Sequence, residues 1–208
     1  MAFSLTLRGE IEAGAKEFEA LNLDVRKDFL PLFYGSFSKR DYAKCRQVLD
    51  QAAKYPELEN DRWDAEVKLN FITKGPFDQA AALETERRLE ATPELHQQSE
   101  GAATSALASV KMLLGKKDEA LRLCEQSVKE HPVPEDAVIN TWRLNTLAVM
   151  YILAGERERA LETMARLVQL PGGLWYGPLK IDPIFDELRN DPRFDEILKQ
   201  SQQPFPRL

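Results

Sequence analysis

The chain has 208 residues, long enough for one large domain or for several stacked repeats. Hydrophobic residues make up 43% and charged residues 30%, the composition of a soluble protein with an apolar core. The net charge of −6 argues against nonspecific binding to nucleic acid or to an anionic membrane, because both need a basic surface. We therefore expect no nucleic-acid partner and no membrane association.

Neither a membrane span nor a signal peptide is recognisable in the sequence. No stretch approaches the roughly 20 apolar residues of a span, and MAFSLTLRGE lacks a basic region followed by a long apolar run. Cys45 and Cys124 are too few for a disulfide framework and lack metal-ligand spacing. We expect a reducing, cytoplasmic location, with both cysteines packed in the core.

The N-terminal third predicts three helices. Residues 4–21 place apolar side chains on one face of a first helix. Residues 27–56 then predict two helices forming a degenerate repeat unit. Their apolar positions are Phe29, Leu32 and Phe33 in the first helix and Tyr42, Cys45, Val48 and Leu49 in the second.

Three evenly spaced glycines indicate an internal repeat. Gly75, Gly115 and Gly155 are forty residues apart, and each ends one helical pattern and precedes another. Glycine suits a helix end because the residue that follows the last turn adopts a left-handed conformation, which costs glycine little. Ala80, Ala120 and Ala160 follow five residues after each glycine, where a small side chain lets two helices cross. The second helices end near Pro93, Pro132 and Pro171.

These residues resemble the tetratricopeptide repeat. The best block carries Leu147, Ala148, Tyr151, Gly155, Ala160, Met164 and Pro171, whereas Lys111 replaces an aromatic residue and Lys68 a small one in earlier blocks. The resemblance implies an all-α fold, an α-solenoid of antiparallel helix hairpins. Residues 1–170 would be the repeat region, with units of about 27–56, 61–93, 101–132 and 141–171 and an extra N-terminal helix.

Residues 171–208 are expected to be a C-terminal capping segment. Two Asp-Pro steps, at Asp182 and Asp191, each read as an N-cap followed by a first-turn proline. Together with the Pro171-Gly172-Gly173-Leu174 run, the steps are similar to the closing segment of bacterial tetratricopeptide regions. Those regions follow winged-helix, adenylate cyclase or serine/threonine kinase domains. The resemblance implies a regulatory region of a signalling protein.

No pattern of catalytic residues is recognisable. The sequence has no glycine-rich phosphate loop, no nucleophile elbow and no zincin motif. Helix capping accounts for Asp182 and Asp191, which leaves no acidic cluster for a metal. We therefore expect a protein that is not an enzyme and that carries no cofactor and no metal.

The resemblance implies that the first helix of each hairpin lines a concave groove, which we expect to bind a protein or peptide partner. Trp142 is the expected anchor, with packing between repeats as the alternative, and Trp175 and Tyr176 are expected to seal the core. A homodimer, a small-ligand-binding sensory region and an all-helical enzyme are the rival functions. Aligning the units on their glycines gives the candidate groove residues Arg62, Leu69, Ile72, Ser105, Ser109, Met112, Trp142, Asn145, Val149 and Ile152.

Overall fold

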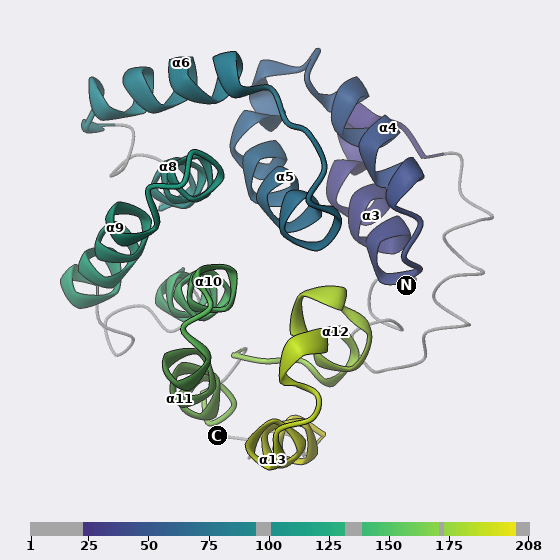
Figure 1. The fold of residues 1–208 in the computed structure, drawn as a ribbon, viewed down its shortest axis with the longest axis vertical. Coiled ribbons are helices and arrows are strands. Elements are labelled where there is room, and N and C mark those ends of the chain that lie inside the picture. The colour runs from purple at the N-terminus through teal and green to yellow at the C-terminus, as the bar shows by residue number, and fades with distance from the viewer. Residues whose placement is uncertain (1–22, 95–100, 132–138, 171–172, 203–208) are drawn as a thin grey trace.

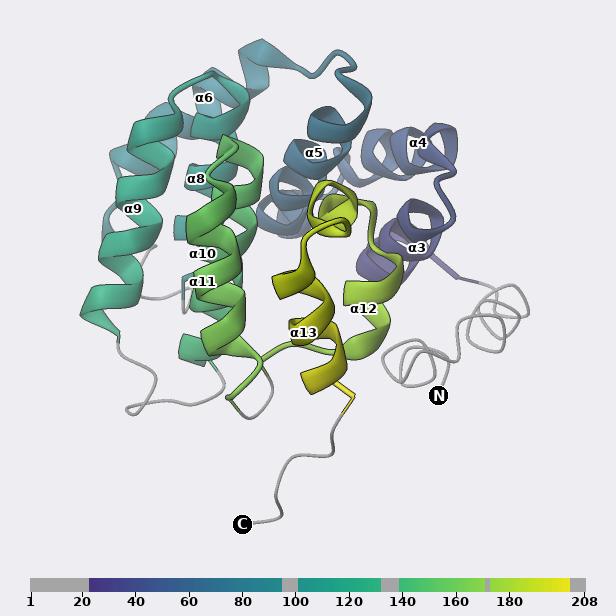
Figure 2. The same cartoon turned by 60° about the horizontal axis from the view of Figure 1, so that its bottom comes forward.

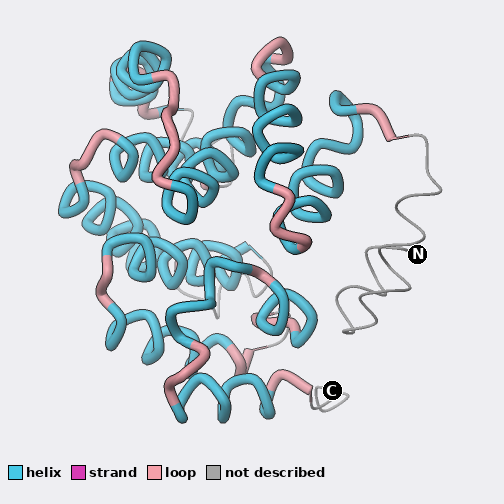
Figure 3. The backbone as a smooth tube through the Cα atoms, turned by 45° about the vertical axis from the view of Figure 1, so that its right-hand side comes forward, coloured by secondary structure: helices cyan, strands magenta, loops and turns pink. Residues whose placement is uncertain are grey.

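A computed structural model describes residues 23–94, 101–131, 139–170 and 173–202. The helix expected over residues 4–21 lies outside these ranges. Every regular element in the described ranges is a helix (Figure 3), so the all-helical prediction is confirmed. No described helix is both long enough and apolar enough to cross a lipid bilayer.

The described helices have the following bounds. In chain order they are α3 (Val25–Ser38), α4 (Tyr42–Ala52), the 3-10 helix η1 (Pro56–Leu58), α5 (Glu59–Thr73), α6 (Gln79–Glu90), α8 (Ala102–Leu113), α9 (Lys117–Glu130), α10 (Ile139–Ala154), α11 (Arg157–Leu167), α12 (Tyr176–Ile181), the 3-10 helix η2 (Pro183–Leu188) and α13 (Pro192–Gln200). Helices α3 to α11 run along a curved path, and the C-terminal segment from α12 to α13 lies across its open side (Figure 1).

Aspartates start several of these helices. The side chains of Asp41 and Asp78 accept hydrogen bonds from backbone N–H groups in the first turns of α4 and α6. Asp182 and Asp191 do the same for η2 and α13, and a proline follows each of them. These bonds satisfy donors that have no partner inside the helix. The predicted N-caps of the two Asp-Pro steps are confirmed.

A residue with left-handed backbone ends the first helix of each hairpin. Gly115 and Gly155 have φ of 80° and 84°, as expected for glycine after a last helical turn. After α5, however, the left-handed residue is Lys74, with φ of 52°, and Gly75 is not left-handed. Arg40, with φ of 59°, has this role after α3. The glycine alignment of the sequence was therefore wrong by one residue in the unit of α5.

Small side chains fill the space behind three of these turns. Cys45, Ala120 and Ala160 each lie five residues after a left-handed residue and are fully buried. Ala80 was expected to be their equivalent but is exposed. The connection from α5 to α6 is longer, because α6 starts only after its cap at Asp78, and Ala82 is buried instead.

Helices α5 and α6 depart from a close hairpin. The backbone of α6 packs mainly against α8, whereas α5 packs against α4 and α8. The fully buried ring of Trp63 fills the space between α5 and α6, and its Nε1 donates a hydrogen bond to Thr85 Oγ1 at 3.2 Å. A bulky ring thus holds apart two helices that small residues would let approach.

The C-terminal segment turns back onto the repeats. Its Phe185, Leu188, Phe194 and Ile197 are buried in the same apolar core as α10 and α11. Helix η2 also contacts α5, and Arg40 Nη2 donates to both carboxylate oxygens of Asp186 at 3.0 and 2.8 Å. The segment therefore joins the last hairpin to the first (Figure 2).

Trp175 does not seal the core as expected. Its side chain is 47% exposed at the N-cap of α12. Tyr176 begins α12 and is half-buried. The apolar residues that do close this end of the core are Leu174 and Leu179.

We predict that Ala160→Phe destabilises the protein by about 1–3 kcal/mol, because a phenyl ring cannot enter the packed space behind the turn without moving its neighbours. Ala80→Phe, at the exposed position, is the matched control and should change stability by no more than about 0.5 kcal/mol. Urea denaturation of both variants gives the free energies of unfolding. Equal effects of the two substitutions would contradict the burial pattern.

Candidate functional site

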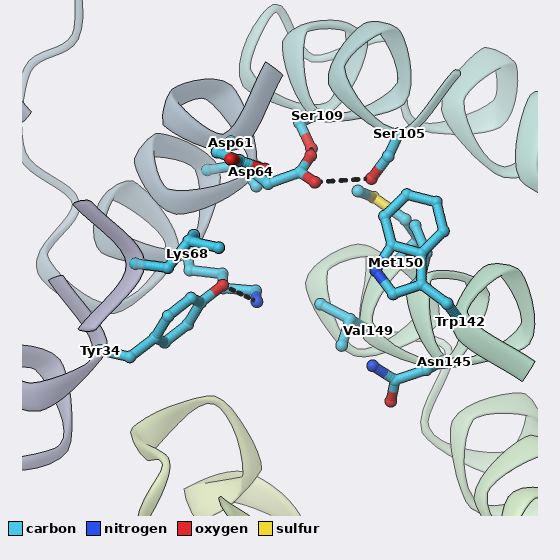
Figure 4. A pocket seen from close by; sticks show the side chains of 13 residues that line it. Tyr34, Asp61, Asp64, Lys68, Ser105, Ser109, Trp142, Asn145, Val149 and Met150 are labelled. Carbon is cyan, nitrogen blue, oxygen red and sulfur yellow. Dashed lines mark hydrogen bonds between the residues drawn. The ribbon is translucent and has the colours of Figure 1, made fainter. Parts of the chain in front are cut away.

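A cavity of about 200 Å³ lies on the inner side of the curved helix array. Its wall comes from four helices, α3, α5, α8 and α10 (Figure 4). Two exposed apolar side chains, Leu30 and Trp142, lie on this wall and lead to its opening. The lining residues are Leu30, Tyr34, Asp61, Asp64, Val67, Lys68, Ser105, Ser109, Trp142, Asn145, Thr146, Val149 and Met150.

Most of the residues that line the cavity occupy equivalent positions in the four helix pairs. Counted back from the left-handed residues Arg40, Lys74, Gly115 and Gly155, the tenth and the sixth position of every unit line the cavity. These two positions are four residues apart, so they lie on the same face of a helix. The tenth positions are Leu30, Asp64, Ser105 and Asn145, and the sixth positions are Tyr34, Lys68, Ser109 and Val149.

Asp64 is held by the neighbouring helix. The hydroxyls of Ser105 and Ser109 donate to its two carboxylate oxygens at 2.8 and 2.7 Å. Burial raises the pKa of Asp64 to about 6, and the two hydroxyls lower it only in part. A carboxylate is thus kept in a partly dehydrated wall with a fixed orientation.

Lys68 supplies the positive charge of the cavity. Its Nζ lies 2.6 Å from the hydroxyl oxygen of Tyr34, to which it donates a hydrogen bond. Burial acts to lower the pKa of Lys68, but Tyr34, Asp182 and Asp64 outweigh this effect and the pKa is raised. Asp182 belongs to the C-terminal segment, so the cation links α5 to that segment electrostatically.

The opposite side of the cavity comes from α10. Trp142 and Asn145 project from this helix toward the side chains of α5 (Figure 4). The Trp142 side chain is 39% exposed, unlike the fully buried Trp63. Part of the Trp142 ring is therefore accessible, while the rest of the side chain is covered by its neighbours.

Five of the ten predicted groove residues meet at this cavity: Ser105, Ser109, Trp142, Asn145 and Val149. The other five do not line it. Leu69 and Ile72 pack with α3 and α4, and Arg62 stacks on the Trp63 ring at 4.3 Å. Met112 and Ile152 are buried in the main core.

The error in α5 follows from the alignment of the sequence on Gly75. Because the left-handed residue is Lys74, every position in α5 shifts by one, and Arg62 and Leu69 are replaced on the inner face by Asp61 and Lys68. Sequence reasoning therefore missed Asp61, Asp64 and Lys68, and it missed Tyr34 because the first unit has no glycine at its turn. The available signal was Lys68 itself, because the alignment on Gly75 put this charged residue at the position of Ala108 and Ala148, where the resemblance implies a small side chain.

A second charged cluster lies between α6, α8 and α9. Glu86, Glu90 and Glu119 bring their carboxylates within 4.8 Å of one another, close enough to hold a metal ion. The buried ammonium of Lys111 occupies the space between them, with its Nζ 3.0, 2.6 and 2.9 Å from one oxygen of each. Burial acts to raise the pKa of Glu86, but Lys116 and Lys111 lower it. The cluster therefore joins three helices through a lysine.

The two cysteines pack in the core as predicted. Both are buried, and burial raises the pKa of each thiol to about 12. A thiol with such a pKa carries almost no thiolate at neutral pH, so neither side chain is a nucleophile.

Comparison of the chain with family models, with curated proteins and with solved structures gives no match. The geometry of the cavity is therefore what bears on function.

We predict that Lys111→Met lowers the free energy of unfolding by about 1–3 kcal/mol, because the buried Glu86 then keeps only Lys116 as a cation and Glu90 and Glu119 lose theirs. The exposed Lys117→Met is the control and should cost at most about 0.5 kcal/mol. Urea denaturation measures both. A Lys111→Met protein as stable as the wild type would show that the cluster does not stabilise the fold.

We predict that the stability of the Asp64→Asn variant, compared with that of the wild type at the same pH, increases as the pH rises. Below about pH 4 Asp64 is protonated in the folded and the unfolded chain, and above its raised pKa of about 6 it is ionised in both. The folded wild type then carries the cost of a buried charge, which asparagine lacks.

The measurement is the difference in free energy of unfolding between Asp64→Asn and wild type, by urea denaturation near pH 4.5 and near pH 7.5. The difference should move in favour of the variant at the higher pH. The exposed Glu162→Gln serves as a control for general charge effects. A difference independent of pH would contradict the burial cost of Asp64.

Proposed function

We propose that the chain is a tetratricopeptide-like helical-repeat module that binds a ligand or partner group in its central cavity and catalyses no reaction. The convergence of two equivalent positions from each of four units on one cavity carries this proposal. A repeat that only built a core would place apolar residues at those positions. Here they are Asp64, Lys68, Ser105 and Asn145 among others, and buried polar groups reduce stability unless they are satisfied.

The character of the wall supports binding over catalysis. Ser105 and Ser109 donate to Asp64 and resemble a nucleophile beside a base, but both hydroxyls serve the same carboxylate. Most of the wall consists of helix interiors, where backbone N–H groups are used in helical hydrogen bonds, and only Asp61 among the lining residues of α5 lies in a first turn. Most backbone N–H groups of the described wall are therefore already used and cannot serve a developing oxyanion, as acyl transfer requires.

The site is smaller than the groove expected for an extended peptide. The C-terminal segment lies across the open side of the array, with Asp186 bound to Arg40 and Asp182 close enough to raise the pKa of Lys68. What remains accessible is a cavity of about 200 Å³, which fits one side chain, one chain end or a small molecule. This observation favours the second candidate, a small-ligand-binding sensory module, over a scaffold for long peptides.

Self-association has weaker support. Among the described residues the exposed large apolar side chains are Leu30, Leu83, Trp142 and Trp175. Two of them, Leu30 and Trp142, belong to the cavity wall, and Leu83 lies on a different helix, α6. Stable homodimers need a larger contiguous apolar area. Light scattering at several concentrations distinguishes a monomer from a dimer.

A cavity-filling variant tests the proposed function. We predict that compounds and short peptides that raise the melting temperature of the wild type no longer do so for Asn145→Trp, because the indole occupies the space of the ligand. Leu83→Ala, away from the cavity, should respond as the wild type does, and circular dichroism checks the folding of both. Ligands that stabilise Asn145→Trp as much as the wild type would show that they bind elsewhere.

A further inference from the structure

The charges around the cavity are unbalanced. Asp61 and Asp64 line it and Asp182 lies nearby, whereas Lys68 is the one cation among the lining residues. The Lys68 ammonium already interacts with the Tyr34 hydroxyl, Asp182 and Asp64. Asp182 also interacts with Arg189. Among the lining residues the two carboxylates exceed the single ammonium at neutral pH, so the cavity attracts positive charge and repels anions.

Asp61 is the carboxylate that remains available. Asp64 accepts from two serines, and Asp182 caps η2 through the Ile184 N–H. For Asp61, no hydrogen bond or ion pair of the side chain is present within the described parts of the chain. Burial alone raises the pKa of Asp61, which means that no described cation offsets the cost of its charge.

An aromatic ring completes the arrangement. Asp61 and Trp142 occupy the same position in their units, thirteen residues before Lys74 and Gly155. The residue equivalent to them in the intervening unit is Ala102, and both Asp61 and Trp142 line the same cavity (Figure 4). An accessible indole face attracts an organic cation, and tryptophan does so best among the aromatic residues.

We propose that the cavity binds the ammonium group of a small organic amine or of a lysine side chain, held between the Asp61 carboxylate and the Trp142 ring. This inference rests on the proposed function, since it names the ligand class of the same cavity. The volume of about 200 Å³ sets the size of the bound group. An apolar cavity of about 150 Å³ holds benzene, so an amine carrying one ring or a short alkyl chain fits.

A bare metal ion suits this wall less well than an ammonium. Both oxygens of Asp64 already accept hydrogen bonds from serine hydroxyls, and the Lys68 ammonium lies on the same face of α5. A hard divalent cation needs about six oxygen ligands, and an indole face is not one of them. An ammonium uses both the carboxylate and the ring.

Calorimetric titration with three probes of similar shape tests the proposal. Benzylamine, benzyl alcohol and benzoate differ mainly in charge, and we expect benzylamine to bind and the other two to bind at least tenfold more weakly or not at all. Asp61→Asn should weaken benzylamine binding by about tenfold, the effect of losing a hydrogen bond to a charged group. Trp142→Leu should weaken it by about fivefold.

The controls separate this proposal from general charge effects and from the proposed function. Glu162→Gln removes one exposed carboxylate on α11 and should leave the affinity unchanged. Binding of benzoate or benzyl alcohol as tight as that of benzylamine, or displacement of benzylamine by Mg²⁺, overturns the ammonium proposal. If benzoate or benzyl alcohol binds the wild type but not Asn145→Trp, the cavity remains the binding site and only the ligand class is wrong.

The source of the ammonium is distinguished in the same experiment. An acetylated, amidated peptide with a central lysine is compared with its norleucine analogue. Tighter binding of the lysine peptide than of benzylamine indicates a protein segment as the natural ligand. Binding of benzylamine alone indicates a free amine. If neither benzylamine nor the lysine peptide binds, the proposal is wrong.

Discussion

The position of one left-handed residue in each unit determines which side chains face the cavity. This residue ends the first helix, and positions counted back from it by ten and by six fall on the inner face. Glycine takes the left-handed conformation at little cost, whereas Arg40 and Lys74 have a Cβ that makes it less favourable. After α5 the cost is offset locally, because Asn70 bonds the turn on both sides, through its backbone oxygen to Lys74 N and through its side chain to Gly75 O.

Most of the secondary structure could be predicted from the sequence, because helix caps and small buried residues act locally. The Asp-Pro steps, Ala120 and Ala160 are where the patterns placed them. Which residues of α5 face the cavity was not predictable in this way. The choice between Lys74 and Gly75 as the left-handed residue depends on the Asn70 hydrogen bonds and on the longer connection to α6. One residue on a helix is a rotation of about 100°, enough to exchange Leu69 for Lys68 on the inner face.

The separation of α5 and α6 was also beyond sequence reasoning. The pattern of the unit predicted a close hairpin, but packing depends on what fills the space between the helices. Trp63 occupies it, and the Lys111 cluster joins α6 to α8 and α9 through ion pairs in addition to the apolar contacts between α6 and α8. A lysine in place of an aromatic residue was visible in the sequence, yet its three acidic partners come from two other helices and meet only in the fold.

The C-terminal segment explains how a polar inner wall is tolerated. An open concave face would leave Lys68 and Asp64 in water, where their interactions are weak. By lying across the array, the segment brings Asp182 to Lys68 and Asp186 to Arg40, so that charges from the first two units and the last segment compensate one another. The same closure excludes water from part of the wall and strengthens every electrostatic interaction inside it. The charge of the cavity and the stability of the array therefore depend on some of the same residues, because Lys68 lines the cavity and also interacts electrostatically with Asp182 of the C-terminal segment.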